Sequence, residues 1–505
     1  MMHKNLTHFN ENSHTGSESF ETDLNKNTTR EKGYWLICKD CDGQGRKRQK
    51  LRKKARLKYQ RAQDKFEKTK SGIAPVQPKG QRYACENCKG SGLVSSGVPP
   101  MVDIKKYPHI AIIGGGIGGV ALAVACLHRG IPFTLYERDA NFTDRSQGYG
   151  LTLQQASIAM MALGISNLKD GLISTRHVVH TTEGKIIGEW GLRKWGRSAV
   201  KSTAKRTNIH IPRQALRKAL LEQLGDQDNV QWAHQLIDLK ECAHGGMSMS
   251  FMVAGKLKNA KADLVVGADG IRSSVRKIVF GEKSTPLKYL GCIVILGICA
   301  LEDLNGLENT LLDAATVFQT ANGNERIYMM PYTSDSIMWQ LSFPISEKAA
   351  KALSVQGPKA LKNEALQRLQ WHAPIPQVIT ATAETKISGY PVYDRALLSP
   401  ELLEKNANVT LIGDAAHPMS PFKGQGANQA LLDALSLARV LAKNCKPQVL
   451  WKESGLRKSV LTEFEEEMLA RSATKVKASA EAARVLHTEE MLQEGDISRG
   501  RDRAQ

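Results

Sequence analysis

Two pairs of cysteines are the residues of this 505-residue chain whose spacing points most directly to chemistry. They occur in residues 38–45 and 85–92, and both segments read C-x-x-C-x-G-x-G. Each C-x-x-C turn presents two thiolates to one metal ion, and two turns complete the tetrahedral set that structural zinc sites prefer. We therefore predict one structural Zn²⁺ held by Cys38, Cys41, Cys85 and Cys88.

The two segments are similar to the cysteine-rich zinc repeats of DnaJ-type chaperones. That family has four repeats and this chain has two, so the resemblance implies one zinc ion. Redox-active C-x-x-C pairs and a disulfide framework are the alternatives. Both are disfavoured by a cytosolic type of composition and by the absence of a thioredoxin-like flank.

A third motif indicates phosphate binding. Residues 109–119 read HIAIIGGGIGG, an apolar strand followed by a G-x-G-x-x-G turn, and a helix is expected over 120–129. The glycines allow a tight turn and a close approach of a pyrophosphate to the backbone, and the helix N-terminus attracts the phosphates. A second apolar strand ends in an acidic residue suited to a ribose hydroxyl. The residues predicted to bind a dinucleotide are Gly114, Gly116, Ile117, Gly118, Gly119, Glu137 and Arg138.

Two further strand-turn-helix segments follow. One passes through Asp269 and Gly270, and the other passes through Gly413 and Asp414 into a loop and a helix opened by residues 424–426. Either segment alone is an ordinary strand-to-helix junction. With the turn at 114–119, and in this order, they resemble the three fingerprints of the single-component flavin-dependent aromatic hydroxylases, such as p-hydroxybenzoate hydroxylase. The resemblance covers residues 105 to about 480.

This resemblance implies an α/β fold: a Rossmann-like FAD-binding domain, an antiparallel β-sheet substrate domain and, in front of them, the small zinc module. It also implies that NAD(P)H reduces FAD and that O₂ then forms a flavin C4a-hydroperoxide, which hydroxylates a small aromatic or polycyclic substrate. Such chemistry belongs to the cofactor, so we assign no catalytic residue and interpret His417 as part of the loop packing. NADH and NADPH both stay open, because Arg272 and Arg276 suit a pyrophosphate or a 2′-phosphate.

The resemblance also assigns roles to individual residues. Asp414 is expected to accept hydrogen bonds from the ribityl hydroxyls of FAD, and the helix N-terminus at Gly424 and Gly426 is expected to stabilise negative charge on the ring. Arg213, which opens an amphipathic helix after Pro212, fills the family's position against the flavin and its phosphates. The other residues expected to bind FAD or NAD(P)H are Asp269, Gly270, Gly413, Pro421, Gln425 and Asn428.

Strand-like runs between about 285 and 390 predict the antiparallel sheet that roofs the flavin. Five of their side chains suit a ring-shaped ligand, although sheet core is the simpler interpretation. These are Met329, Met330, Tyr332, Met338 and Trp339.

The expected domain order is a disordered polar N-terminus (1–37), the zinc module with a basic helical arm (38–92), a linker (93–106), the FAD-binding monooxygenase domain (107–445), and a C-terminal helix with a polar tail (446–505). The formal charge of +20 is concentrated between residues 46 and 70. A solvated charged arm, either hairpin or helix, is the simpler interpretation of that run, and contact with nucleic acid or a protein partner is the alternative.

No apolar run reaches the roughly 20 residues that a membrane helix needs, and the polar first 37 residues do not resemble a signal peptide. We therefore expect a cytoplasmic protein without a membrane span. Two other functions stay open: a flavoprotein oxidoreductase that inserts no oxygen, and an interaction protein whose zinc and basic module binds nucleic acid or protein clients.

Overall fold

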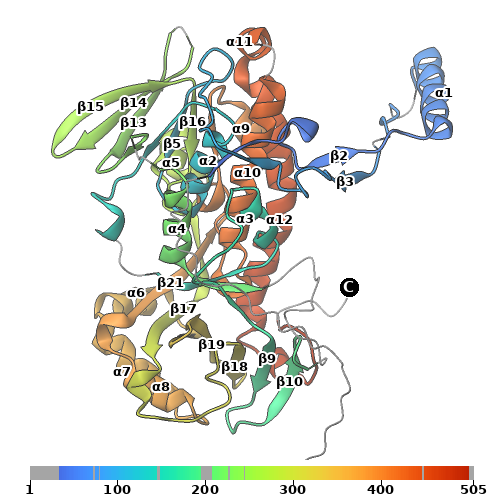
Figure 1. Ribbon diagram of the computed structural model, residues 1–505. Coiled ribbons are helices and arrows are strands. Elements are labelled where there is room, and N and C mark those ends of the chain that lie inside the picture. The colour runs from blue at the N-terminus through green and yellow to red at the C-terminus, as the bar shows by residue number, and fades with distance from the viewer. Residues whose placement is uncertain are drawn as a thin grey trace, which may run out of the picture.

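The computed structural model describes residues 33–71, 74–78, 80–144, 148–194, 208–225, 228–243, 245–445 and 448–499. Figure 1 shows a body built on a parallel sheet, a second sheet beneath it, and a small N-terminal module from which one helix projects. Within the described residues, no helix is both long and apolar enough to cross a bilayer.

The body contains a five-stranded, fully parallel sheet in the order β12-β6-β5-β16-β22. Strands β5, β16 and β22 are completely buried, as expected for a parallel sheet with helices on both faces. The strands are β5 (Ile110–Ile113), β6 (Phe133–Tyr136), β12 (Val230–Gln231), β16 (Leu264–Gly267) and β22 (Val409–Leu411).

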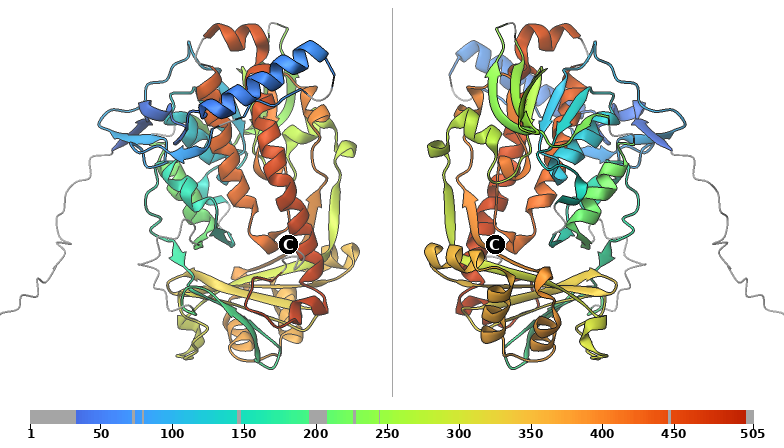
Figure 2. Two further views of the ribbon diagram at one scale, coloured as in Figure 1. Left: turned by 90° about the vertical axis from the view of Figure 1, so that its right-hand side faces the viewer. Right: turned by 90° about the vertical axis from the view of Figure 1, so that its left-hand side faces the viewer.

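Two long helices of the body reach its neighbours, the N-terminal module and the second sheet. The first, α10 (Gly426–Asn444), packs along α2 (Ile117–Leu127), which is apolar on all sides because it lies between sheet and helix. The second, α12 (Thr462–Val485), runs from the upper body down to the second sheet (Figure 2). The remaining helices of the body are α3 (Ser157–Met161), α4 (Arg213–Glu222), α5 (Ser274–Phe280), α9 (Pro400–Glu404) and α11 (Gln448–Leu456).

The second sheet has seven strands in the order β10-β9-β18-β19-β20-β17-β21. Every neighbouring pair is antiparallel except β18 with β9. Three helices cover one face and enclose a core around Trp339 (Figure 1). The elements are β9 (Arg176–His180), β10 (Ile186–Trp190), β17 (Leu287–Ala300), β18 (Thr316–Ala321), β19 (Arg326–Thr333), β20 (Ser336–Pro344), β21 (Ile387–Arg395), α6 (Glu347–Val355), α7 (Pro358–Arg368) and α8 (Ile375–Ala381).

The structure therefore has the predicted pair of sheets, but the second one draws on more of the chain than the expected 285–390. Strands β9 and β10, from residues 176–190, also belong to the second sheet. They join it because β9 pairs in parallel with β18 and β10 pairs with β9. Two three-stranded sheets complete the body. They consist of β7 (Gly150–Leu153), β8 (Leu172–Ile173) and β11 (Ile209–Pro212), and of β13 (Gln235–Glu241), β14 (Met247–Val253) and β15 (Lys256–Ala262).

The N-terminal module consists of two strand pairs around the cysteines. Strand β1 (Tyr34–Ile37) pairs with β4 (Leu93–Ser96), and β2 (Arg46–Arg48) pairs with β3 (Arg82–Ala84). Helix α1 (Lys53–Thr69) lies between β2 and β3 in the chain. The ladder of β1 with β4 occupies parts of the segments expected to be a disordered N-terminus (1–37) and a linker (93–106), because it closes the module just outside each C-x-x-C turn. Residues 1–32 and 500–505 lie outside the described part of the chain.

Candidate functional site

A cavity of about 740 Å³ lies between the parallel sheet and the seven-stranded sheet. Its walls come from the carboxyl ends of β5, β16 and β22, from the start of α4, and from β18, β19 and β20. Ligands of open α/β sheets bind outside these carboxyl ends. Of the residues predicted to bind cofactor, the cavity wall contains Gly116, Ile117, Gly118, Arg213, Gly270, Gly413, Asp414, Pro421, Gly424, Gln425 and Gly426.

The glycine-rich turn joins β5 to α2. At Gly114, φ is +109° and an added Cβ would lie 2.6 Å from the carbonyl oxygen of Ala268, so a larger side chain does not fit. At Gly116 the nearest atom to an added Cβ is on the Arg213 guanidinium, 3.8 Å away, which leaves the backbone open toward the cavity. The free N–H groups of the first turn of α2 lie at this opening, an arrangement that fits a bound pyrophosphate.

Glu137, directly after β6, binds the backbone of the glycine-rich turn. One carboxylate oxygen accepts a hydrogen bond from the Gly115 N–H at 2.7 Å, and the other accepts one from the Asp139 N–H at 3.0 Å. Arg138 is exposed, with its Nε 4.0 Å from the Asp139 carboxylate. Neither Glu137 nor Arg138 lies on the cavity wall. The structure gives Glu137 a role in holding the turn, and the ribose contact stays a prediction.

A second arginine on α4 was missed by the sequence analysis. Arg217 is buried, and its Nε donates to the Gly115 carbonyl at 2.7 Å. Its guanidinium also lies over the rings of Phe142 and Trp232, 5.1 and 5.5 Å from their centroids. The signal was its position four residues after Arg213, which places both side chains on one face of the helix.

Asp414 follows β22 and lines the cavity, where no described residue donates a hydrogen bond to its carboxylate. Burial raises the pKa of Asp414, while the positive charges of His417 and Arg213 oppose that rise. The Asp414 side chain remains accessible from the cavity, so its carboxylate can accept hydrogen bonds from a ligand there. The hydroxyls of a ribityl chain are donors of the right kind, so Asp414 fits its expected role toward FAD.

Three charged side chains, two of them buried, hold the loop around Asp414. Asp433 of α10 accepts hydrogen bonds from the Gly413 N–H at 2.8 Å and from His417 Nε2 at 2.7 Å. Its other oxygen accepts one from Arg471 of α12 at 2.7 Å. Burial alone would lower the pKa of His417, but the charge of Asp433 outweighs burial and raises it. His417 therefore positions the loop, in keeping with its interpretation as a packing residue.

Asn428 does not face the cofactor side, contrary to expectation. Its Oδ1 accepts hydrogen bonds from the N–H groups of Gln154 at 2.8 Å and Ala156 at 3.2 Å. Its Nδ2 donates to the carbonyls of Thr152 at 2.9 Å and Gly424 at 2.8 Å. The carboxamide has no donor or acceptor position left for a ligand. Asn428 instead fixes the start of α10 against the end of β7.

Gln425 does lie on the cavity wall, and its carboxamide is tied to two other glutamines. It donates to Gln154 Oε1 at 2.7 Å and accepts from Gln429 Nε2 at 3.3 Å. The first turn of α10 is thereby presented to the cavity as a unit, with its free N–H groups at Gly426.

The segment around Asp269 has a largely structural role. The Asp269 carboxylate accepts hydrogen bonds from the N–H groups of Ser274 at 2.7 Å and Val275 at 3.2 Å, and so caps α5. It does not lie on the cavity wall, whereas the neighbouring Gly270, with φ +83°, does. A cofactor contact of Asp269 stays a prediction.

Of the two arginines considered for NAD(P)H, the structure leaves one available. Arg276 is buried, and its Nη1 donates to the carbonyls of Ala415 and Ala416, each at 2.9 Å. Arg276 therefore supports the loop beside Asp414 and has no route to a 2′-phosphate. Arg272 is exposed and lines the cavity.

The far wall of the cavity belongs to the second sheet and includes two methionines. Met330 and Met338 face each other across β19 and β20 and line the cavity. Met329 and Trp339 are the next residues along these strands and point to the opposite face, into the core under α6, α7 and α8, because side chains alternate along a strand. Tyr332 packs beside the first two without reaching the wall.

Arg326 of β19 is a second functional candidate that the sequence did not reveal. It lines the cavity at 4% exposure, and its Nε donates to Gln319 Oε1 at 2.8 Å. Its guanidinium lies 5.0 Å from the Tyr328 ring centroid, and no described acidic side chain pairs with it. Burial lowers the pKa of Arg326 to about 10, so it stays cationic at neutral pH. A buried unpaired cation is costly, and a ligand with an anionic oxygen would relieve that cost.

The C-terminal segment forms another part of the wall. Ser498 and Arg499 line the cavity. Arg499 Nη2 donates to the Ile187 carbonyl at 3.1 Å, and the Gly495 N–H donates to the same carbonyl at 2.9 Å, which fixes the segment to β10. The sequence predicts a polar tail for these residues, whereas the structure places them on the cavity wall.

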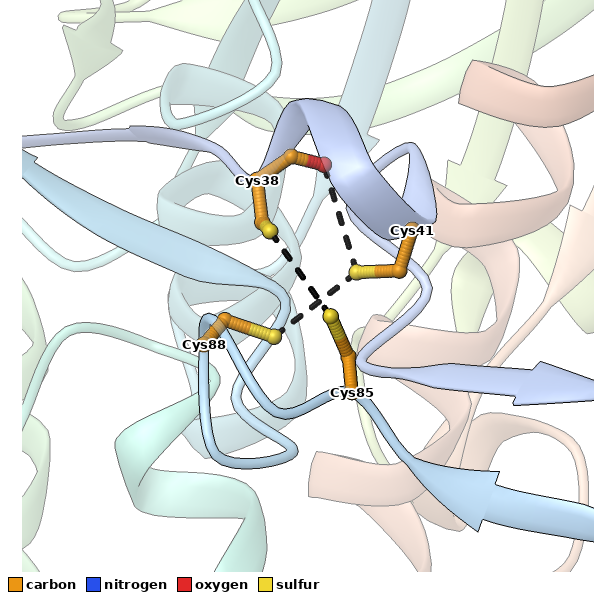
Figure 3. Close-up of side chains that lie close together, drawn as sticks. All are labelled: Cys38, Cys41, Cys85 and Cys88. Atoms are coloured by element: carbon orange, nitrogen blue, oxygen red, sulfur yellow. Dashed lines mark hydrogen bonds between the residues drawn. The ribbon is translucent and has the colours of Figure 1, made fainter.

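The four cysteines meet in one cluster, as predicted (Figure 3). Their sulfur atoms all lie within 4.8 Å of one another, and the separations are 4.0 Å for Cys38 to Cys85 and 3.7 Å for Cys41 to Cys88. Four thiolates around one Zn²⁺ at about 2.3 Å would have sulfurs about 3.8 Å apart. The cluster therefore fits a tetrahedral metal ion, and no disulfide occupies it.

Two arginines, one buried and one partly buried, attach this module to the body. Arg129, just after α2, donates to the Gly43 carbonyl at 3.2 Å. Arg439 of α10 donates to the Ser91 carbonyl at 3.4 Å, and its own carbonyl accepts from Gln44 at 3.1 Å. The module thus lies against the far ends of the two helices whose first turns line the cavity.

Comparison with known proteins agrees with this geometry. Residues 107–450 match the family model described as "FAD binding domain", so the chain belongs to that family. The aurachin C monooxygenase/isomerase of Stigmatella aurantiaca is 29% identical over 70% of this chain and 86% of that protein. The 3-amino-4-hydroxybenzoate 2-monooxygenase PtnB3 of Streptomyces platensis is 27% identical over 66% and 79%. The expected class, an FAD-dependent monooxygenase, is thereby confirmed.

Solved structures show the same fold. The 2,6-dihydroxypyridine-3-hydroxylase of Arthrobacter nicotinovorans superposes with a TM-score of 0.63 at 18% identity, over 78% of this chain and 95% of that one. Klebsiella pneumoniae HpxO, solved with FAD and uric acid, superposes with a TM-score of 0.62 at 21% identity, over 76% and 90%.

Proposed function

We propose that this protein uses NAD(P)H and O₂ to hydroxylate an aromatic substrate that carries an anionic oxygen, such as a carboxylate or phenolate. The observation that carries the proposal is the shared cavity, which joins the unpaired Asp414 carboxylate on one side to the unpaired Arg326 cation and a methionine wall on the other. Bound FAD would supply the reduction and the activation of oxygen.

The protein's own residues would bind and orient the reactants. The Gly116 turn and Arg213 would hold the phosphates, and Asp414 would accept from the ribityl hydroxyls. Met330 and Met338 would exclude water from the reacting face of the substrate. Arg326 would orient the substrate through its anionic oxygen.

Purified protein reconstituted with FAD provides the test. NADH or NADPH oxidation is followed with a panel of phenols and aminobenzoates, and products are analysed by mass spectrometry under ¹⁸O₂. A product that is 18 mass units heavier than the unlabelled substrate has gained one ¹⁸O atom, which supports hydroxylation. Substrate-dependent turnover without incorporated oxygen would show a flavoprotein oxidoreductase and overturn the proposal.

We further propose that Cys38, Cys41, Cys85 and Cys88 hold a structural Zn²⁺. The sulfur separations support this, as does the close contact of the two turns, where a Cβ on Gly92 would lie 2.5 Å from the Gly43 carbonyl oxygen. All nine cysteines are unpaired, which supports a reducing compartment such as the cytoplasm. Metal analysis of the purified protein should find one zinc per chain, and Cys41→Ser should lose it while Cys242→Ser keeps it.

A further inference from the structure

The projecting part of the N-terminal module contributes nothing to the core of the protein. We call β2, α1 and β3 together the arm (Figure 1). Helix α1 has 17 residues and none of them is buried. Residues 46–70 contain thirteen Lys or Arg and two acidic side chains, which accounts for more than half of the formal charge of +20. More than half of the net positive charge therefore lies on the arm, whose helix adds no buried residue to the core.

The basic side chains of α1 are aligned. Five of them follow one another at spacings of four, three, four and three residues, which places them on one face of the helix. At 1.5 Å per residue this stripe is about 21 Å long. We call it the basic stripe, and its members are Lys54, Lys58, Arg61, Lys65 and Lys68.

The basic stripe has no acidic partners in the described part of the chain. The acidic residues of α1 are Asp64 and Glu67, and neither forms an ion pair with the stripe; Glu67 accepts a hydrogen bond from Gln63 at 3.0 Å. Like charges four residues apart, such as Lys54 with Lys58, each destabilise a helix by about 0.2–0.5 kcal/mol. The helix keeps this repulsion although none of its residues is buried.

The strand pair β2 and β3 also places positive charges next to one another. Arg48 on β2 lies directly opposite Arg82 on β3. Like charges in directly opposed positions of an antiparallel pair repel each other. Both are exposed, and Arg48 donates to the Gly80 carbonyl rather than to an acid.

We propose that the arm binds the phosphate backbone of nucleic acid. A linear row of unpaired cations matches a regularly spaced row of phosphates, whose counterions are released on contact. A membrane surface fits less well, because an interfacial helix needs a broad apolar face and α1 has Tyr59 and Phe66 as its large apolar side chains beside Leu57. The proposal is independent of the reaction in the cavity.

The experiment uses the full-length protein and a fluorescein-labelled 20-base-pair DNA duplex, with fluorescence anisotropy measured between 50 and 200 mM KCl. The variant Lys58→Gln/Arg61→Gln/Lys65→Gln removes three charges from the basic stripe. The matched control, Lys256→Gln/Lys258→Gln/Lys261→Gln, removes three charges from exposed lysines of the edge strand β15. Circular dichroism and bound flavin confirm that both variants fold.

We expect wild-type binding that weakens as salt rises. The stripe variant should bind at least ten-fold more weakly, with the slope of log K against log salt reduced by about 2 to 3, and the control should change less than two-fold. Equal losses in both variants, or no wild-type binding at 50 mM KCl, would overturn the proposal. Stripe-dependent binding to phosphatidylserine vesicles in place of the duplex would also overturn it and identify a membrane surface.

Discussion

The guanidinium of Arg129 donates to the Gly43 carbonyl at 3.2 Å, so a buried cation of the flavin body lies directly behind the cysteine turn. Arg129 is 4% exposed and has no acidic partner among the described residues. A zinc ion with four thiolates carries two negative charges. Arg129 and Arg439 are well placed to balance them.

This relationship predicts that Arg129→Met weakens metal binding without touching a ligand. Loss of the balancing charge and of the bond to Gly43 should cost about 1–3 kcal/mol, which corresponds to an affinity for zinc that is about 5- to 150-fold weaker in competition with a chelator. Zinc release is measured with a colorimetric chelator. Lys89→Met is the matched control, because it removes an exposed charge beside Cys88, and its zinc release should stay at the wild-type level.

Five histidines, four of them buried and one partly buried, predict that the protein is sensitive to acid. Burial lowers their pKa values to between about 3 and 4, whereas unfolded histidine titrates near 6.5. Between these values the unfolded chain binds more protons than the folded one, so stability is lost as pH falls from about 6.5 toward 4. The residues are His128, His177, His180, His210 and His487.

Thermal unfolding at pH 7.5, 6.5, 5.5 and 5.0 measures this loss, and the midpoint should fall progressively below pH 6.5. His210→Gln should flatten the dependence by one proton. A flat profile down to pH 5 would contradict the assignment of these histidines as buried and neutral.

Arg326→Met should abolish the preference for acidic substrates. A hydrogen bond to a charged group contributes about 1.5–3 kcal/mol, so the ratio of KM values for a hydroxybenzamide and the matching hydroxybenzoate should fall about 10- to 100-fold. Flavin content should not change, because Arg326 lies on the wall opposite Asp414. Arg326→Lys should retain part of the preference, and equal discrimination in all three proteins would place the anion elsewhere.

Removal of residues 493–505 should open the cavity wall at Ser498 and Arg499. Water then reaches the site, so NAD(P)H oxidation without product should increase several-fold relative to hydroxylation. The ratio of product formed to NAD(P)H consumed measures this effect. Removal of 500–505 alone is the control and should keep the wild-type ratio, because Arg499 and its bonds to β10 are retained.

The glycine turns and the cysteine cluster could be predicted because each is specified by residues close together in the chain. The Gly114 turn needs a backbone conformation that favours glycine, and each C-x-x-C pair is short enough to converge on one ion. These signals do not depend on the rest of the fold.

The missed features all depend on contacts between distant segments. Strand β9 enters the second sheet through its parallel pairing with β18, more than a hundred residues away. Arg326 is a single arginine at the start of an apolar strand, and its candidate role depends on the cavity that β19 lines. Asn428 looked available because its backbone partners at Thr152 and Gln154 are about 270 residues earlier in the chain.

Helices α2 and α10 each have one end at the flavin cavity and the other against the cysteine cluster. A displacement of either helix at the cysteine end would therefore also displace its first turn at the cavity. If the cluster holds a metal ion, its removal should therefore change the absorption and fluorescence spectra of bound flavin. The flavin spectrum would then report on the state of the four cysteines.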